Sequence, residues 1–206
     1  MQDCHYMQSY GIGFYEYFLL CELLSTKNRK CRPLPVLNIG VACQFRSYET
    51  VPVDSPEFQE YVQDALDLIE FANGPVTSKW GKLRAEMGHP ESFNLELLAI
   101  GNEQWESKNV DVAPRYLAFE KAIHKVYPEI KCLGTAGPFV NHELHTQAWD
   151  FYKAECAKNP DFTYAVDEHY YVEPKWLYEN VDFYDNYPRN IGIFAGEYAG
   201  HDENQK

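Results

Sequence analysis

The fold of this chain is decided by the stretch Leu95-Glu-Leu-Leu-Ala-Ile-Gly-Asn-Glu-Gln-Trp105. Its apolar residues follow one another almost without polar interruption, which is typical of a strand buried on both faces of a parallel sheet. The apolar run ends abruptly at Gly101, and Asn102 and Glu103 follow. Groups at the carboxyl ends of the strands line the active site of a parallel α/β barrel. Glu103 is therefore a candidate general acid.

Predicted strands and helices alternate along the rest of the chain. Because they alternate at intervals of about 30 to 40 residues, they predict a parallel sheet with crossover helices, in one unit spanning residues 1–206. The basic segment 25–32 is predicted to be a solvated connection, and residues 75–94 a loop. Strands are predicted over residues 33–40, from about 95, and over 131–137, 162–171 and 191–199. Helices are predicted over residues 11–25, 57–71, 113–126, 142–157 and 175–180.

Composition excludes several classes of protein. The chain has 206 residues, of which 45% are hydrophobic, so it can bury a globular core. Its formal net charge is −13, from 31 acidic and 18 basic residues, which argues against binding nucleic acid or an anionic membrane. No run of about 18 apolar residues could span a bilayer. The expected partner is thus neither nucleic acid nor membrane.

The cysteines show neither a C-x-x-C pair nor a zinc-binding spacing. In a chain of this length, such cysteines are predicted to be free and mostly buried thiols rather than a disulfide framework. We therefore expect no structural metal at these positions. The six residues are Cys4, Cys21, Cys31, Cys43, Cys132 and Cys156.

Two of the predicted strands end in glutamates that follow glycine closely. Glu103 ends one of these strands, and Glu197 ends the last strand in Phe194-Ala-Gly-Glu-Tyr-Ala-Gly-His201. Burying an acid at such a place costs free energy unless it has a partner or a task. Glycoside hydrolysis needs two carboxyl groups, one to protonate the departing oxygen and one to attack the anomeric carbon or activate water. The separation of the two groups distinguishes these mechanisms, and the sequence leaves it open.

Three further residues fit a sugar site. Asn102 can donate a hydrogen bond to the sugar hydroxyl next to the anomeric carbon. His169 and Tyr171 are two residues apart on a predicted strand, so they project to one side and could orient a carboxylate on the neighbouring strand. A purely structural role for both stays open. The run Asp167-Glu-His169 is a weak metal signal without a second ligand cluster, so no metal and no cofactor are predicted.

The chain resembles the catalytic domain of α-L-arabinofuranosidases of glycoside hydrolase family 51 from about Tyr6 to its end. The resemblance implies a retaining double displacement with Glu103 as acid/base, held neutral by apolar surroundings, Glu197 as nucleophile and Asn102 as the preceding amide. It also implies that His169 and Tyr171 bind substrate, with Tyr170 as the alternative to Tyr171. The motifs that carry it are Gly101-Asn-Glu103, Asp167-Glu-His-Tyr-Tyr171, Phe194-Ala-Gly-Glu-Tyr-Ala199 and Leu83-Arg-Ala-Glu-Met-Gly-His-Pro90.

The same resemblance implies an α/β fold of the TIM (β/α)8-barrel type. In that family the acid/base follows the fourth strand and the nucleophile the seventh, whereas here they follow the second and fifth predicted strands. The expectation is an incomplete barrel of about five βα units that lacks the first two strands and the last. The C-terminal β-sandwich of the family is expected to be absent.

The expected activity is release of terminal α-L-arabinofuranosyl residues from arabinose-containing polysaccharides or oligosaccharides. One alternative is another retaining barrel glycosidase, such as a xylosidase or endoglucanase. The other is a non-catalytic fragment that binds carbohydrate or a partner chain, and unpaired sheet edges could also drive homo-oligomerisation. The residues after Met1 lack the basic and apolar regions of a signal peptide. A secreted or periplasmic location is nevertheless favoured for a longer parent protein.

Overall fold

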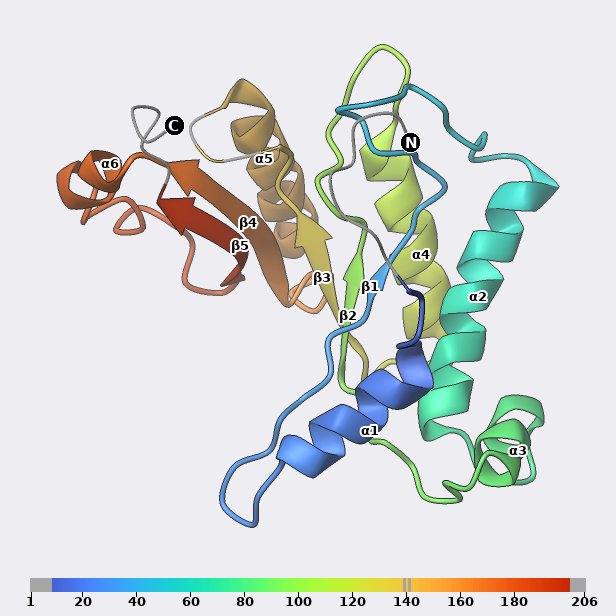
Figure 1. Cartoon of the computed structure of the whole chain (residues 1–206). Helices are drawn as coiled ribbons and strands as arrows, with labels where there is room; N and C mark the ends of the chain where they lie inside the picture. The colour runs from blue at the N-terminus through green and yellow to red at the C-terminus, as the bar shows by residue number, and fades with distance from the viewer. Residues whose placement is uncertain (1–8, 139, 141, 201–206) are drawn as a thin grey trace.

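Five parallel strands form a single sheet in which spatial order follows chain order (Figure 1). The computed structural model describes residues 9–138, 140 and 142–200. The first residues, including Cys4 and Tyr6, and His201 lie outside the described residues. The strands are β1 (Val36–Leu37), β2 (Leu97–Ile100), β3 (Lys131–Thr135), β4 (Ala165–Val172) and β5 (Gly192–Gly200).

Helices connect successive strands, as the sequence predicts for a parallel sheet. This consecutive parallel order is the arrangement of neighbouring strands in a TIM-type barrel. Within the described residues the sheet does not close, and β1 and β5 form its two edges. The helices are α1 (Phe14–Leu24), α2 (Pro56–Asn73), α3 (Lys79–Glu86), α4 (Val112–Val126), α5 (Glu143–Lys158) and α6 (Pro174–Glu179).

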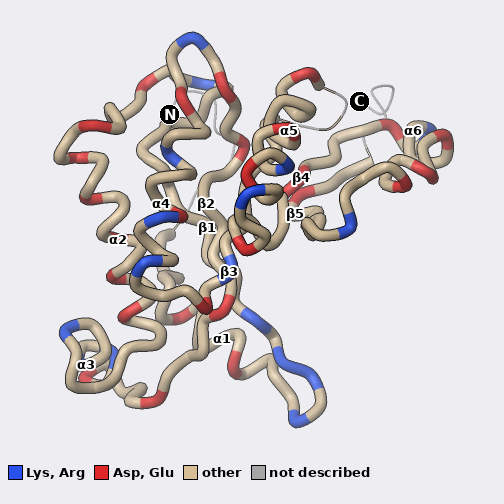
Figure 2. Tube along the Cα trace, turned by 180° about the vertical axis from the view of Figure 1, so that it is seen from behind, with Lys and Arg blue, Asp and Glu red and all other residues tan. Residues whose placement is uncertain are grey.

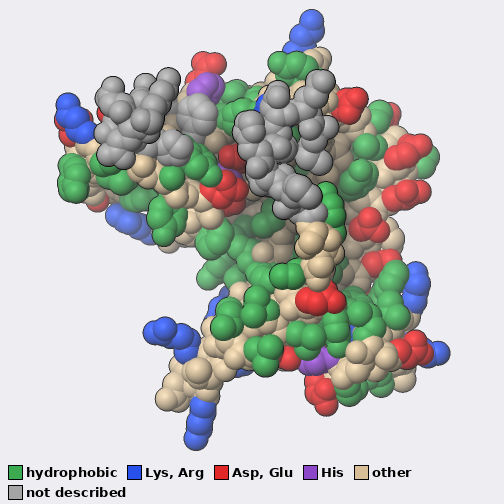
Figure 3. Space-filling view, viewed as in Figure 1, with side chains coloured by type: hydrophobic (Ala, Val, Ile, Leu, Met, Phe, Trp, Pro, Cys, Tyr) green, Lys and Arg blue, Asp and Glu red, His purple; other side chains and the backbone are tan. Residues whose placement is uncertain are grey.

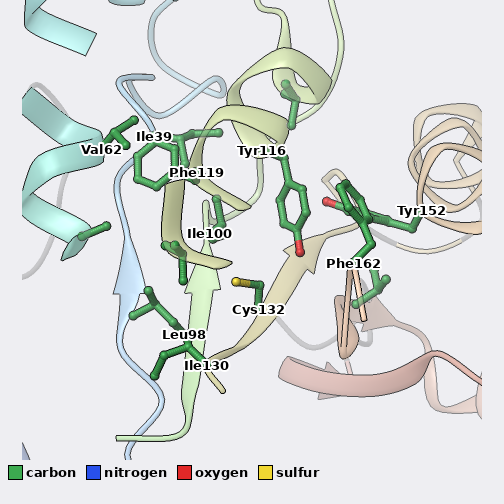
Figure 4. Packing of buried hydrophobic residues seen from close by; sticks show 14 of the residues in the cluster. Ile39, Val62, Leu98, Ile100, Tyr116, Phe119, Ile130, Cys132, Tyr152 and Phe162 are labelled. Carbon is green, nitrogen blue, oxygen red and sulfur yellow. The ribbon is translucent and has the colours of Figure 1, made fainter. Parts of the chain in front are cut away.

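The main hydrophobic core lies between the sheet and the helices on its outer face. Side chains of a strand alternate between faces, and Leu98 and Ile100 of β2 point into this core (Figure 4). Tyr116 and Phe119 of α4 and Tyr152 of α5 pack there with them. The buried apolar run of β2 is therefore the centre of the fold, as its sequence predicts.

The inner face of the sheet carries a second, smaller apolar cluster. Ala99, Leu133 and Ala165 are buried there, with Leu34 and Leu97 packed against them. A cavity of about 920 Å³ adjoins this face at the amino ends of the strands. Figure 3 shows hydrophobic side chains exposed between the end of the sheet that holds β4 and β5 and helix α1.

Local signals explain where helix α2 begins. The hydroxyl of Ser55 accepts a hydrogen bond from the backbone N–H of Phe58, and Pro56 occupies the first turn. Both features favour a helix start. Gly74 follows the last helical residue, so the predicted helix 57–71 is confirmed and extends slightly at each end.

The prediction that residues 75–94 form a loop is wrong, because helix α3 lies within this segment. Ser78 caps the helix by accepting a hydrogen bond from the N–H of Gly81. The side chain of Arg84 is 1% exposed, and its guanidinium stabilises the surrounding turns by donating to backbone carbonyls. These tertiary contacts, rather than apolar periodicity, hold the helix. The accepting carbonyls belong to Phe71, Gly74, His89 and Pro90.

The other sequence predictions agree with the structure at the level of elements. All five cysteines in the described ranges are free, but Cys31 and Cys43 are exposed, so only three of the five are buried. Segment 25–32 is exposed, and Figure 2 shows basic residues gathering there while acidic residues spread over the other elements. Among the helices that the structure describes, none is long and apolar enough to cross a membrane.

Candidate active site

Three ionisable side chains meet at the carboxyl ends of the strands. The Nδ1 atom of His169 lies 3.0 Å from Oε1 of Glu103 and 3.7 Å from Oε2 of Glu197. One side-chain oxygen of each glutamate and a ring nitrogen of the histidine all lie within 4.8 Å of one another. The structure therefore brings the two glutamates predicted from the sequence into one cluster, with His169 between them.

The turn that carries Glu103 has an unusual backbone. Gly101 has a φ of 86° and Glu103 a φ of 51°, in the left-handed region that non-glycine residues rarely adopt. Holding a non-glycine residue there costs about 1–3 kcal/mol, and such residues cluster at functional sites. The side chain of Gln104 stabilises the turn by accepting a hydrogen bond from the N–H of Asn102. A Cβ atom at position 101 would lie 2.7 Å from this side-chain oxygen, and the φ of 86° would strain any residue that carries a Cβ atom, so glycine is favoured there.

A buried glutamine ties this turn to the loop that follows β1. The side-chain amide of Gln44 donates to the carbonyl of Trp105 and accepts from its N–H, both at 2.9 Å. Gln44 is 6% exposed. Sequence reasoning did not identify Gln44, because an isolated glutamine carries no pattern that links it to a segment 61 residues away. It also did not identify Gln104, although the contact of Gln104 with Asn102 is local.

His169 is held from both sides. Its Nε2 atom lies 3.3 Å from Oδ2 of Asp167, opposite the contact with Glu103. Burial by itself would lower the pKa of His169, but hydrogen bonds to Asp167 and Glu103 and the charges of Asp167 and Glu197 raise this pKa to about 9. At neutral pH the imidazole is therefore protonated on both nitrogens, and it donates to the side chains of Asp167 and Glu103.

Tyr171 reaches the second glutamate. Its hydroxyl donates to Oε2 of Glu197 at 2.6 Å. This hydrogen bond, together with burial and the charges of Glu197 and Glu103, raises the pKa of Tyr171 to about 12. The tyrosine therefore remains a proton donor at physiological pH. His169 and Tyr171 project to the same side of β4, as their spacing predicts.

Tyr170, the sequence-based alternative to Tyr171, points to the other face of β4. Its hydroxyl donates to Glu168 rather than to either site glutamate. Glu168 is fully buried and also accepts from Nε2 of His145, Nε1 of Trp149 and the hydroxyl of Tyr184. Because Glu168 lies on the face opposite Asp167 and His169, this three-residue run cannot converge on one metal ion.

Another trio has the spacing of metal ligands. Glu103, His169 and Glu197 could each offer one ligand atom within 4.8 Å of the others. A metal ion there would have to displace a proton from His169, whose pKa is raised to about 9. The charge distribution of the resting site thus suits an imidazolium between carboxylates.

The surroundings of Glu103 differ from the expectation of an apolar environment. Its carboxylate contacts the charged imidazole of His169, because the barrel-facing side of β4 carries polar residues. A cavity of about 230 Å³ adjoins Glu103 and is also lined by Asn38, Gln44 and the exposed Asn102. Asn102 therefore lies beside the candidate acid, where a ligand could reach it.

Comparison with known proteins gives one family for this chain. The sequence profile described as "Alpha-L-arabinofuranosidase 1 domain" matches residues 1–189. The chain is 42% identical over 197 residues to an extracellular exo-alpha-L-arabinofuranosidase of Streptomyces chartreusis, covering 94% of this chain and 22% of that protein. It is 33% identical over 190 residues to alpha-L-arabinofuranosidase 2 of Arabidopsis thaliana, covering 92% of this chain and 24% of that protein. The chain thus spans about a quarter of the length of these relatives.

Solved structures give the same family. An arabinose-bound α-L-arabinofuranosidase of glycoside hydrolase family 51 superposes with a TM-score of 0.67 at 27% identity, covering 90% of this chain and 26% of that chain. A family 51 α-L-arabinofuranosidase from Bifidobacterium longum superposes with a TM-score of 0.56 at 14% identity, covering 82% and 29% of the two chains. The latter supports the fold alone.

Proposed function

Because this chain belongs to the family of the α-L-arabinofuranosidase 1 domain, we propose that it carries the catalytic glutamates of an α-L-arabinofuranosidase. The substrates are arabinose-containing polysaccharides or oligosaccharides, from which terminal α-L-arabinofuranosyl residues are released. One observation carries this proposal: a carboxylate oxygen of Glu103 lies within 4.8 Å of one of Glu197.

The separation of the glutamates supports a retaining mechanism. Retaining glycosidases hold their two carboxyl groups about 5–5.5 Å apart, whereas inverting enzymes need about 6.5–9.5 Å to admit a water molecule. One carboxylate oxygen of Glu103 lies within 4.8 Å of one of Glu197, which is below the range of inverting enzymes. This separation leaves no room for a water between nucleophile and sugar, so direct attack by a carboxylate is favoured.

The contacts of the site assign a role to each side chain. Glu103 first takes up a proton, and it gives this proton to the leaving oxygen while Glu197 attacks the anomeric carbon, so that the glycosidic bond breaks to leave a glycosyl-enzyme ester. Glu103, now a carboxylate beside the His169 imidazolium, then takes a proton from water, which attacks the same carbon and releases Glu197. Tyr171 holds Oε2 of Glu197, and Asn102 is the donor to the adjacent sugar hydroxyl.

The strands fit defined places in the barrel of the family. We assign β2, which precedes Glu103, to the fourth position and β5, which carries Glu197, to the seventh. The first, second and eighth positions of the barrel are then not occupied by the described strands. Substrate contacts from those positions would add to the site described above.

Covalent labelling tests the proposed function. A mechanism-based arabinofuranosyl inhibitor should label the chain at Glu197, and Glu197→Ala should abolish the label. Glu103→Ala should lose turnover of a furanoside with a poor leaving group, and azide should restore turnover when the leaving group is good. Glu129→Ala, which changes an exposed acid elsewhere, should behave as the unmodified chain. Persistent labelling of Glu197→Ala would refute the assignment of the nucleophile.

Exposed apolar groups favour a second candidate, a non-catalytic segment that binds a partner chain. Ile193 and Phe194 on the edge strand β5 are 37% and 40% exposed, and an unpaired edge with apolar side chains favours association. This second hypothesis predicts that the isolated chain does not turn over a furanoside. It also predicts that the molecular mass measured by sedimentation increases with protein concentration. Turnover by a monomer would exclude it.

A further inference from the structure

The pairing of β4 with β5 is interrupted beside the nucleophile. Asp167 pairs with Phe194, but His169 pairs with Glu197. The pairing therefore advances by three residues along β5 and by only two residues along β4. An extra residue of this kind is a β-bulge, which bends the strand and redirects its side chains. The bulge comes immediately before Glu197, so it decides where that carboxylate points.

The carboxylate of Asp167 occupies the bulge. Its Oδ1 atom accepts a hydrogen bond from the N–H of Gly196 at 2.9 Å, in place of a backbone carbonyl. A Cβ atom at position 196 would clash with this Oδ1 atom and crowd the rest of the carboxyl group, so the close approach favours glycine. The residue that precedes the nucleophile is therefore held by a side chain from the neighbouring strand.

The other oxygen of the same carboxylate contacts the acid/base side of the site. Oδ2 of Asp167 lies 3.3 Å from Nε2 of His169, and Nδ1 of that imidazole lies 3.0 Å from Oε1 of Glu103. Asp167 is 6% exposed, so water competes little for these contacts. A single buried carboxylate thus connects the bulge before Glu197 with the side chain of His169, which contacts Glu103.

We propose that Asp167 is a positioning residue that sets both catalytic glutamates, with Oδ1 capping the bulge that aims Glu197 and Oδ2 orienting His169 against Glu103. The proposal rests on the catalytic roles assigned above, although its structural part is independent of them. Loss of alignment by about 1 Å can cost on the order of a hundredfold in rate. A carboxylate that aligns two groups at once therefore has a large effect without touching substrate.

Asp167→Asn separates the two contacts, since it keeps the shape of the side chain but removes its charge. The amide oxygen can still accept from Gly196, which places the amide nitrogen against Nε2 of His169, where two donors would face each other. The pKa of His169, measured by NMR titration of the labelled imidazole, should fall from about 9 by at least one unit. The rate of covalent labelling at Glu197 should fall about a hundredfold.

Gly196→Ala tests the bulge separately, because the added methyl group displaces Oδ1 of Asp167 without removing its charge. Labelling at Glu197 should fall strongly, while His169 should stay protonated to a higher pH than in Asp167→Asn. Glu168→Gln is the matched control, since Glu168 is the adjacent buried carboxylate on the opposite face of β4. It should lower the melting temperature but leave the titration of His169 unchanged.

The outcomes distinguish this inference from the proposed function. If Asp167→Asn leaves the pKa of His169 and the labelling rate unchanged, the positioning role is wrong. It is also wrong if Glu168→Gln moves the titration of His169 as far as Asp167→Asn does, because the effect would then reflect general loss of structure. If the unmodified chain shows no labelling but the pKa of His169 shifts as stated, the catalytic proposal fails while the contact between Asp167 and His169 stands.

Discussion

Two adjacent carboxylates on β4 lie in contrasting environments on the two faces of the sheet. Glu168, on the outer face, is fully buried, and its partners His145, Trp149 and Tyr184 come from α5 and the segment after α6. Asp167, on the inner face, contacts a backbone N–H and the ionisable His169 at the edge of an open site. The same chemical group therefore stabilises the fold on one face and organises a reactive site on the other.

The tyrosines repeat this contrast. Burial is the first cause that raises the pKa of Tyr184, followed by the charge of Glu168 and the hydrogen bond to it. For Tyr171, the hydrogen bond to Glu197 is the first cause. The raised pKa of the outer tyrosine, Tyr184, thus comes mainly from burial, whereas that of the inner one, Tyr171, comes mainly from the candidate nucleophile.

Among the changes considered, Glu168→Ala, which lies on the outer face, should have the largest effect on stability. It leaves the donors of His145, Trp149 and Tyr184 buried without an acceptor, so the free energy of unfolding should fall by about 3–5 kcal/mol. Urea unfolding followed by circular dichroism measures this change. Glu129→Ala, at an exposed position, should change stability by less than about 0.5 kcal/mol. If Glu168→Ala lowered the free energy of unfolding by an equally small amount, the proposed difference between the two faces of the sheet would be wrong.

A pair of tyrosine variants sharpens the comparison with smaller effects. Tyr171→Phe removes the donor to Glu197, so labelling at that residue should slow about tenfold, while stability changes little because the side chain is exposed. Tyr170→Phe removes a buried donor to Glu168 and should cost about 1–2 kcal/mol of unfolding free energy without slowing the labelling. The reverse pattern would mean that Tyr170, not Tyr171, serves the site.

The pH dependence of stability gives the finest test of the inner face. The pKa of His169 is raised to about 9 in the folded state, against about 6.5 for an unfolded histidine. Its contribution to stability is therefore complete below about pH 6.5 and is lost as the pH rises through about 9. Urea unfolding between about pH 6 and 10 should show this decline, and His169→Gln should flatten it. Equal slopes for the two proteins would contradict the raised pKa.

The repeating elements were predictable because local patterns determine them. The apolar run before Gly101, the caps of α2 and the alternation of strands with helices are all set by residues close together in the chain. The two candidate glutamates were also predictable, since each follows a glycine closely near the end of a predicted strand, although in the structure Glu103 comes after β2 and Glu197 lies within β5. Helix α3 was missed because the buried guanidinium of Arg84 holds it through contacts with Phe71, Gly74, His89 and Pro90.

The sequence by itself determined the parallel α/β class, the positions of Glu103 and Glu197, and the common side of His169 and Tyr171, because a strand places every second side chain on one face. Only the tertiary structure decided the distance between the two glutamates, the bulge before Glu197 and the link that Asp167 makes across it. These features depend on how β4 pairs with β5 and on how the turn after β2 is held by Gln44 and Gln104. The contacts of Gln44 with Trp105 and of Asp167 with Gly196 join residues distant in the chain, and no local pattern encodes them.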